Sequence, residues 1–117
     1  MAHVMVVDDD RGTVRLLTIL LKMDGFQVSQ SPGPKIALEQ AKSADAFVID
    51  CHLADFDGLQ LLRAIRANNE LVGKLVIMTS GKDREQEAMA AGADMFLLKP
   101  FSPNKLSASL SELFKEA

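Results

Sequence analysis

Five short apolar segments alternate along this chain with five segments of helical periodicity. Apolar runs of this length, bounded by turn residues, are typical of strands that are buried on both faces. The second of them alternates apolar and polar residues and therefore suits the edge of a sheet. Strands that alternate with helices favour a parallel sheet covered by helices on both faces. We therefore expect an α/β, doubly wound (βα)5 fold with strands at 3–7, 26–30, 47–50, 74–78 and 95–98.

Glycines and capping residues mark the ends of the expected helices. The first helix begins after Gly12, and Gly25 is a candidate C′ residue at its end. Asp57 and Ser102 are candidate N-caps for the third and the fifth helix. The second and fourth helices are expected at 35–42 and 82–91.

The composition is that of an ordinary globular protein, with 117 residues, 48% of them hydrophobic and 25% charged. This length is enough for one core, and we expect a single domain over 1–117. The net charge of -3 gives no reason to expect nucleic acid or an anionic membrane as a direct partner. No apolar run approaches the roughly 18 residues of a membrane span, and no signal-peptide pattern is present. We therefore expect a cytoplasmic protein.

Polar residues follow four of the apolar segments at the point where each expected strand ends. The carboxyl ends of parallel strands lie at one edge of the sheet, where open α/β folds bind ligands. The sequence therefore predicts one site at this edge. Its candidate residues are Asp8, Asp9, Asp50, Thr79 and Lys99.

The charges of these residues limit what the site can do. Two carboxylates ~4 Å apart repel by about 4 kcal/mol at an effective dielectric constant of 20. Three of them stay ionised together only if a cation joins them. Mg²⁺ (or Mn²⁺) is a hard divalent ion that prefers carboxylate oxygens as ligands. Lys99 adds a positive point charge and Thr79 a hydroxyl donor. This set is suited to phosphoryl transfer, in which positioning and charge neutralisation do most of the catalysis.

The order of these residues resembles the receiver domain of two-component response regulators over essentially the whole chain. The matching motifs are Asp8-Asp9, Asp50, Asp57-Gly58, Thr79 and Lys99-Pro100. The resemblance implies a flavodoxin-like, five-stranded parallel sheet with strand order 2-1-3-4-5. It also implies a signalling domain rather than an enzyme, which is phosphorylated on one of its own aspartates.

The resemblance further implies a role for each matching residue. Asp50 would be the phosphoacceptor, and Lys99 would contact a phosphoryl oxygen. Mg²⁺ (or Mn²⁺) would be bound by Asp9, Asp50 and the backbone carbonyl of His52, with Asp8 helping through water.

Two further features of the family concern the switch and the chain geometry. Thr79 would move toward the phosphoryl group, and Phe96 would fill the space that Thr79 vacates. The peptide bond between Lys99 and Pro100 would be cis, a conformation whose energetic cost is small only before proline.

The expected partners also follow from the resemblance. A histidine kinase or a phosphotransfer protein would donate the phosphoryl group, and a downstream effector or a fused output domain would read the result.

This chain departs from the family at Ala54, where proline is usual, and at Phe96, which lacks a tyrosine hydroxyl. Met95 replaces one member of an acidic pair found in regulators that dimerise through their fourth helix, fifth strand and fifth helix. We therefore expect a monomer or a weak dimer.

Several other interpretations remain open for the same residues. Asp10 suits a helix cap better than a metal ligand, and Cys51 suits a small buried filler better than a nucleophile. A receiver-like module that binds partners without phosphorylation is the alternative function, but such a module should have lost an acidic or lysine position. A phosphatase of the haloacid dehalogenase type requires an acid two residues after the nucleophile, where this chain has His52.

Overall fold

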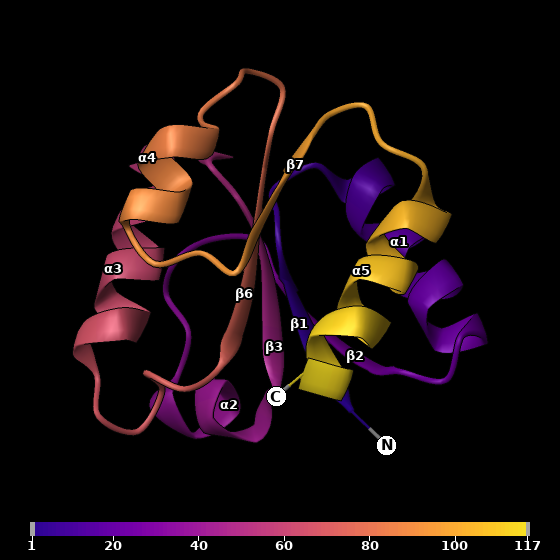
Figure 1. The fold of residues 1–117 in the computed structure, drawn as a ribbon, viewed down its shortest axis with the longest axis horizontal. Helices are drawn as coiled ribbons and strands as arrows, with labels where there is room; N and C mark the ends of the chain where they lie inside the picture. Colours follow the sequence, from indigo (N-terminus) through magenta and orange to yellow (C-terminus); the bar gives the residue numbers. More distant parts are fainter. Residues whose placement is uncertain (1, 117) are drawn as a thin grey trace.

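The five long strands of this computed structural model, which describes residues 2–116, form one parallel sheet (Figure 1). The strands are β1 (His3–Val7), β2 (Gln27–Ser31), β3 (Ala46–Asp50), β6 (Leu75–Ser80) and β7 (Met95–Leu98). Their order is β2-β1-β3-β6-β7, with every neighbouring pair parallel. This confirms the predicted fold class and the strand order 2-1-3-4-5, and it places the weakly apolar β2 at an edge.

Helices cover both faces of the sheet, as the alternating pattern predicts. Figure 1 views the sheet along its edge and shows α1 (Arg11–Met23) and α5 (Pro103–Glu116) on one side of it. The other side carries α2 (Leu38–Ser43), α3 (Gly58–Ala67) and α4 (Glu85–Ala90). Each side has its own apolar core layer. Among the described residues, no helix is long and apolar enough to cross a bilayer.

Two helices begin three residues later than predicted. The second helix starts at Leu38 instead of 35, because Ala37 has an extended backbone and offers no side-chain cap. The fourth starts at Glu85 instead of 82, since Asp83 accepts a hydrogen bond from the Glu85 N–H and so favours a turn before the helix. Helical periodicity is a weak guide to the first turn of a short helix.

A small antiparallel hairpin follows β3 directly and is absent from the sequence prediction. Its strands are β4 (His52–Leu53) and β5 (Phe56–Asp57), two residues each. Such strands are too short to show a periodicity of two. The hairpin matters for the site because it begins two residues after Asp50.

The predicted caps are confirmed. The Asp10 carboxylate accepts hydrogen bonds from the Gly12 N–H and the Thr13 hydroxyl at the start of α1. Asp57 accepts from the Leu59 N–H, and Ser102 Oγ accepts from the Lys105 N–H. Gly25 follows the C-cap of α1 with a φ of +95°, the left-handed conformation that glycine adopts without strain. Asp10 is thus placed as the cap that the sequence favoured.

Gly58 allows α3 to pack directly on the end of β3. Its N–H donates to the Cys51 carbonyl at 2.8 Å. A Cβ atom at this position would overlap the Asp50 carbonyl oxygen and lie 2.9 Å from the Asp50 carbonyl carbon. Since both obstacles are backbone atoms, no side-chain rotation can relieve the clash. The absence of a side chain at Gly58 therefore fixes how closely the hairpin folds back behind Asp50.

We predict that Gly58→Ala lowers the free energy of unfolding by about 1–3 kcal/mol or more, as overpacking does, despite the better helix propensity of alanine. Urea unfolding followed by circular dichroism measures this change. Gly33→Ala is the matched control, because nothing lies within 4 Å of a Cβ atom there. Equal stability of the two variants would contradict the packing argument.

Candidate functional site: an acidic cluster at the carboxyl edge

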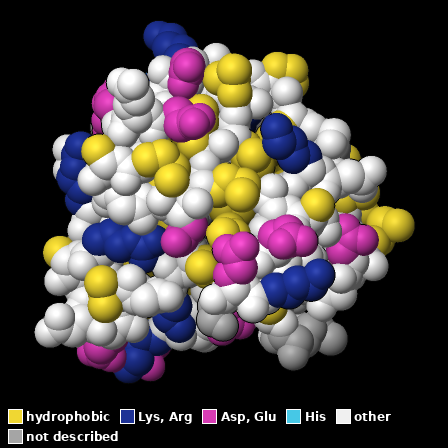
Figure 2. Space-filling model, viewed as in Figure 1, with side chains coloured by type: hydrophobic (Ala, Val, Ile, Leu, Met, Phe, Trp, Pro, Cys, Tyr) yellow, Lys and Arg dark blue, Asp and Glu magenta, His cyan; other side chains and the backbone are white. Residues whose placement is uncertain are grey.

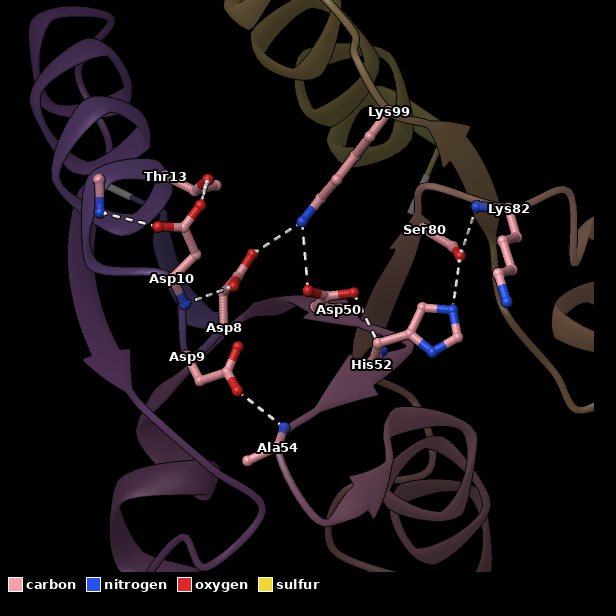
Figure 3. A network of polar contacts seen from close by, with 11 residues as sticks. Asp8, Asp9, Asp10, Thr13, Asp50, His52, Ala54, Ser80, Lys82 and Lys99 are labelled. Carbon is pink, nitrogen blue, oxygen red and sulfur yellow. Dashed lines mark hydrogen bonds and ion pairs between the residues drawn. The ribbon is translucent and has the colours of Figure 1, made fainter.

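Three aspartates meet where the carboxyl ends of β1 and β3 lie side by side (Figure 3). Asp8 and Asp9 follow β1 directly, and Asp50 is the last residue of β3. Each offers a carboxylate oxygen, and these oxygens lie within 4.8 Å of one another. Asp8 and Asp50 are buried, whereas Asp9 is exposed. The sheet therefore brings together residues that stand 41 positions apart in the chain, Asp9 and Asp50.

Lys99 connects the two buried carboxylates. It follows β7 and extends over the sheet edge so that its Nζ lies 3.1 Å from Asp8 Oδ2 and 3.2 Å from Asp50 Oδ2. The two carboxyl side chains are only 4% and 10% exposed, so this contact is shielded from solvent far more than a surface ion pair. Lys99 thus links the end of the edge strand β7 to the ends of the inner strands β1 and β3.

Backbone N–H groups hold the other oxygens of the cluster. Asp50 Oδ1 accepts from the His52 N–H at 3.0 Å, and Asp8 Oδ1 accepts from the Asp10 N–H at 2.9 Å. Asp9 Oδ2 accepts from the Ala54 N–H at 2.7 Å. Each aspartate therefore has a fixed orientation. Two of the three donors, the N–H groups of His52 and Ala54, belong to the hairpin.

Burial and charge act in opposite directions on this cluster. Burial raises the pKa of Asp8, and the Asp10 N–H and the charge of Lys99 only partly counteract that effect. Burial alone would lower the pKa of Lys99, but the charges of Asp8 and Asp50 outweigh it, so the pKa lies above its ordinary value. Lys99 is therefore a permanent cation at neutral pH.

The residues of the cluster fit a hard divalent cation. Three carboxylates face one ammonium group, so the cluster carries a surplus of negative charge. Oxygen ligands are those that Mg²⁺ and Mn²⁺ prefer, and Mg²⁺ is usually held by one or two carboxylates together with water. A groove of about 560 Å³ is lined by Asp8 and Asp9 together with residues of α1 and of the end of β2.

Thr79 and Ser80 end the neighbouring strand β6, and both are buried. Thr79 pairs in register with Asp50. Ser80 was not among the predicted site residues, yet its Oγ lies 3.1 Å from the His52 Nε2 and accepts from the Lys82 N–H (Figure 3). The sequence pattern suggests only a cap at this position, because a serine next to a threonine after a strand is common before a helix.

The remaining predicted residues lie around this edge. Phe96 is partly buried in β7 and pairs in register with Met78, the residue before Thr79. The peptide bond between Lys99 and Pro100 is cis. Cys51 is fully buried, and burial raises the pKa of its thiol to about 11, so it stays protonated and is no nucleophile at neutral pH.

The chain belongs to the response regulator receiver domain family, whose sequence model matches residues 4–111. It is 34% identical over 120 residues to the transcriptional regulatory protein GltR of Pseudomonas aeruginosa, covering 97% of this chain and 49% of that protein. It is 28% identical to the alkaline phosphatase synthesis transcriptional regulatory protein PhoP of Bacillus subtilis, with 97% and 49% covered. The chain thus spans about half the length of these relatives.

Solved structures show the same fold. The chemotaxis protein CheY4 of Vibrio cholerae superposes with a TM-score of 0.86 at 26% identity, covering 96% of this chain and 98% of that one. A CheY-like receiver domain protein of Methanospirillum hungatei gives a TM-score of 0.88 at 23% identity, covering 99% and 95%. The resemblance to two-component receiver domains that the motifs indicated is confirmed.

Arg84 is a second residue that the sequence pattern missed. It stands before α4, and its guanidinium contacts both oxygens of Asp57, at 3.3 and 3.1 Å, and also Glu87 Oε2 at 3.0 Å. The hydrogen bond from Arg84 holds the pKa of Asp57 below its usual range, although burial works the other way. Because Asp57 also caps α3, this contact ties the end of the hairpin to the start of α4.

We predict that Arg84→Met lowers the free energy of unfolding at pH 7 by about 0.5–1 kcal/mol, since Asp57 is partly exposed and the contact is screened. A carboxyl group whose pKa is depressed in the folded state contributes its full stability above the unfolded pKa of about 4, and this contribution is lost as pH falls from there through the lower folded pKa. The difference in the free energy of unfolding between Arg84→Met and wild type should therefore shrink as pH falls below about 4 in urea titrations. Lys82→Met in the same loop is the control, and a difference that grows in acid would refute the assignment.

Proposed function

We propose that this receiver domain accepts a phosphoryl group on Asp50 from a histidine kinase or a phosphotransfer protein, in a reaction that requires Mg²⁺ (or Mn²⁺). The observation that carries the proposal is the contact of Lys99 Nζ with both Asp8 and Asp50 beside the third carboxylate, Asp9. In the transfer, an Asp50 oxygen forms the new O–P bond as the P–N bond of a donor phosphohistidine breaks. The bonding electrons leave with the imidazole nitrogen.

The orientation of Asp50 supports a role as nucleophile. One of its oxygens is held by the His52 N–H and the other by Lys99 Nζ, so the carboxylate does not rotate freely. An incoming phosphoryl group brings further negative charge to a site that already has a surplus. Lys99 can stay in contact with Asp50 and also reach a phosphoryl oxygen, which neutralises part of the charge that develops there.

The acidic cluster would hold the cation. Asp9, Asp50 and the backbone carbonyl of His52 would bind it directly, and Asp8 would act through water. When bound, the cation supplies positive charge opposite the phosphoryl oxygens. Without it, Lys99 alone would have to balance three carboxylates and the phosphoryl group, which exceeds the charge of one ammonium.

The output of the domain would be a changed surface. Thr79 would turn toward the phosphoryl group on the neighbouring strand, and Phe96 would follow it. A downstream effector or an output domain would read the change. The domain would catalyse the phosphorylation of its own Asp50 and the hydrolysis of the resulting acyl phosphate, and it would not act as an enzyme on other substrates. A cytoplasmic location fits these partners. The complete set of Asp8, Asp9, Asp50 and Lys99 argues against a module that binds partners without phosphorylation.

We predict that incubation with acetyl phosphate and Mg²⁺ adds one phosphoryl group to the protein and that Asp50→Asn abolishes the addition. Mass spectrometry of the intact protein, with borohydride trapping of the acyl phosphate, measures both the amount and the position. Asp55→Asn is the control, because this exposed carboxylate lies in the nearby hairpin outside the cluster. Normal modification of Asp50→Asn would refute the proposed acceptor.

The state of Asp94 supports a monomeric or weakly dimeric domain. Its Oδ2 contacts Arg66 Nη2 at 3.0 Å and also accepts from the Val76 N–H at 2.8 Å. Arg66 donates in addition to the carbonyl oxygen of Gly92 at 2.8 Å. The acidic residue next to Met95 is therefore already used inside its own chain. Figure 2 views the molecule from the side on which α4, β7 and α5 lie in Figure 1, and it shows apolar side chains in the middle with acidic and basic side chains around them.

We predict a monomeric mass at micromolar concentration, both with and without Mg²⁺ and beryllofluoride. Asp94→Ala should leave this mass unchanged while it lowers the free energy of unfolding by about 1–2 kcal/mol, since it removes an acceptor of two hydrogen bonds. Light scattering and urea unfolding measure the two effects. A stable dimer that Asp94→Ala dissociates would show that Asp94 serves between chains.

A further inference from the structure

The turn of the hairpin contains a strained residue. Ala54 lies between β4 and β5 with a φ of +23°, and it is the one non-glycine residue with positive φ among residues 2–116. A residue with a Cβ atom avoids this region unless surrounding contacts hold it there, and such residues gather at functional sites. The contact that holds Ala54 therefore needs to be identified.

That contact is the hydrogen bond from the Ala54 N–H to Asp9 Oδ2, at 2.7 Å. It joins residues 45 positions apart and has an ionised acceptor, which makes it one of the stronger kinds of hydrogen bond. Asp9 is exposed and lies beside two other carboxylates. Repulsion from Asp8 and Asp50 would turn a free Asp9 side chain out toward water. The Ala54 N–H opposes this rotation.

The hydrogen bond also sets the direction of the remaining oxygen. In Figure 3, one oxygen of Asp9 points to Ala54, and the other points back toward Asp8 and Asp50. Asp9 is thus held in the orientation in which its second oxygen can join the other two carboxylates around one ion. A hydrogen bond to a metal-binding carboxylate orients that ligand and tunes its affinity.

The side chain at this position decides whether the hydrogen bond is possible. Receiver domains usually carry proline where this chain has Ala54. Proline has no N–H, and its ring fixes φ near −65°, far from +23°. A chain with proline here could therefore form neither the turn conformation nor the donor. Alanine at this position therefore supplies a donor that proline lacks.

We propose that Ala54 is a positioning residue whose N–H fixes Asp9 for binding of the divalent cation, so that the hairpin turn and the metal site are coupled. This rests on the proposed function, in which Asp9 is a direct ligand. The coupling runs both ways. A cation that holds Asp9 beside Asp50 favours the hydrogen bond between Asp9 and the Ala54 N–H, and loss of this hydrogen bond lets the Asp9 side chain rotate away from the other carboxylates.

The first test measures Mg²⁺ affinity by NMR titration of backbone amides, without any phosphodonor. Ala54→Pro should weaken the affinity by about tenfold, the lower end of the effect of removing a partner of a metal ligand. Ala54→Gly keeps the N–H and tolerates positive φ, so its Mg²⁺ affinity should stay close to that of the wild-type protein. In an Asp9→Ala background, Ala54→Pro should cause no further loss, because the group through which it acts is gone.

The second test needs no metal and covers the case in which Ala54→Pro does not fold. Hydrogen exchange of the Ala54 amide should be slow in the wild-type protein and become fast in Asp9→Ala, whereas the amide of exposed Asp55 serves as the reference. A fast Ala54 amide in the wild type would overturn the proposal. So would an equal loss of Mg²⁺ affinity from Ala54→Pro with and without Asp9. If Asp9→Ala alone left the affinity unchanged, the direct metal role of Asp9 in the proposed function would also fail.

Discussion

The contact of one lysine with two buried carboxylates is the interaction on which the rest of this site depends. Lys99 Nζ lies 3.1 and 3.2 Å from Asp8 and Asp50. Two carboxylates buried together without a cation would repel each other strongly and take up protons instead. The three residues follow or end three different strands, so they meet only when the sheet has the observed order. The fold and the site therefore support each other.

The sequence predicts the sheet and the acidic cluster because both follow from local patterns. Four of the five long strands are short apolar runs, and Asp8, Asp50 and Lys99 stand where such runs end. Parallel topology then brings these ends to one edge without any further information. The late starts of α2 and α4 and the hairpin β4–β5 were not predicted, because they depend on individual turns. The role of Arg84 was not predicted, because this residue stands directly before α4 and not at the end of a strand.

The residues around the cluster share one structural principle: the segments that leave the strand ends are tied back to the carboxylates or to one another. The hairpin donates to Asp50 and Asp9 through backbone N–H groups. Ser80, at the end of β6, contacts the His52 ring, and Arg84 ties Asp57 to the start of α4. Backbone donors leave no trace in a side-chain pattern, which explains why the role of Ala54 emerged only from the structure. We therefore expect a change of charge at Asp50 to alter the conformation of these segments before that of the rest of the domain.

A crystal structure of the protein with Mg²⁺ and beryllofluoride tests the central claim most directly. The account predicts a beryllium adduct on an Asp50 oxygen, Lys99 Nζ in contact with a fluoride, and the cation held by Asp9, Asp50 and the carbonyl oxygen of His52. Asp9 should keep its hydrogen bond to the Ala54 N–H in that state. An adduct on another residue, or a cation bound away from the three carboxylates, would contradict the account.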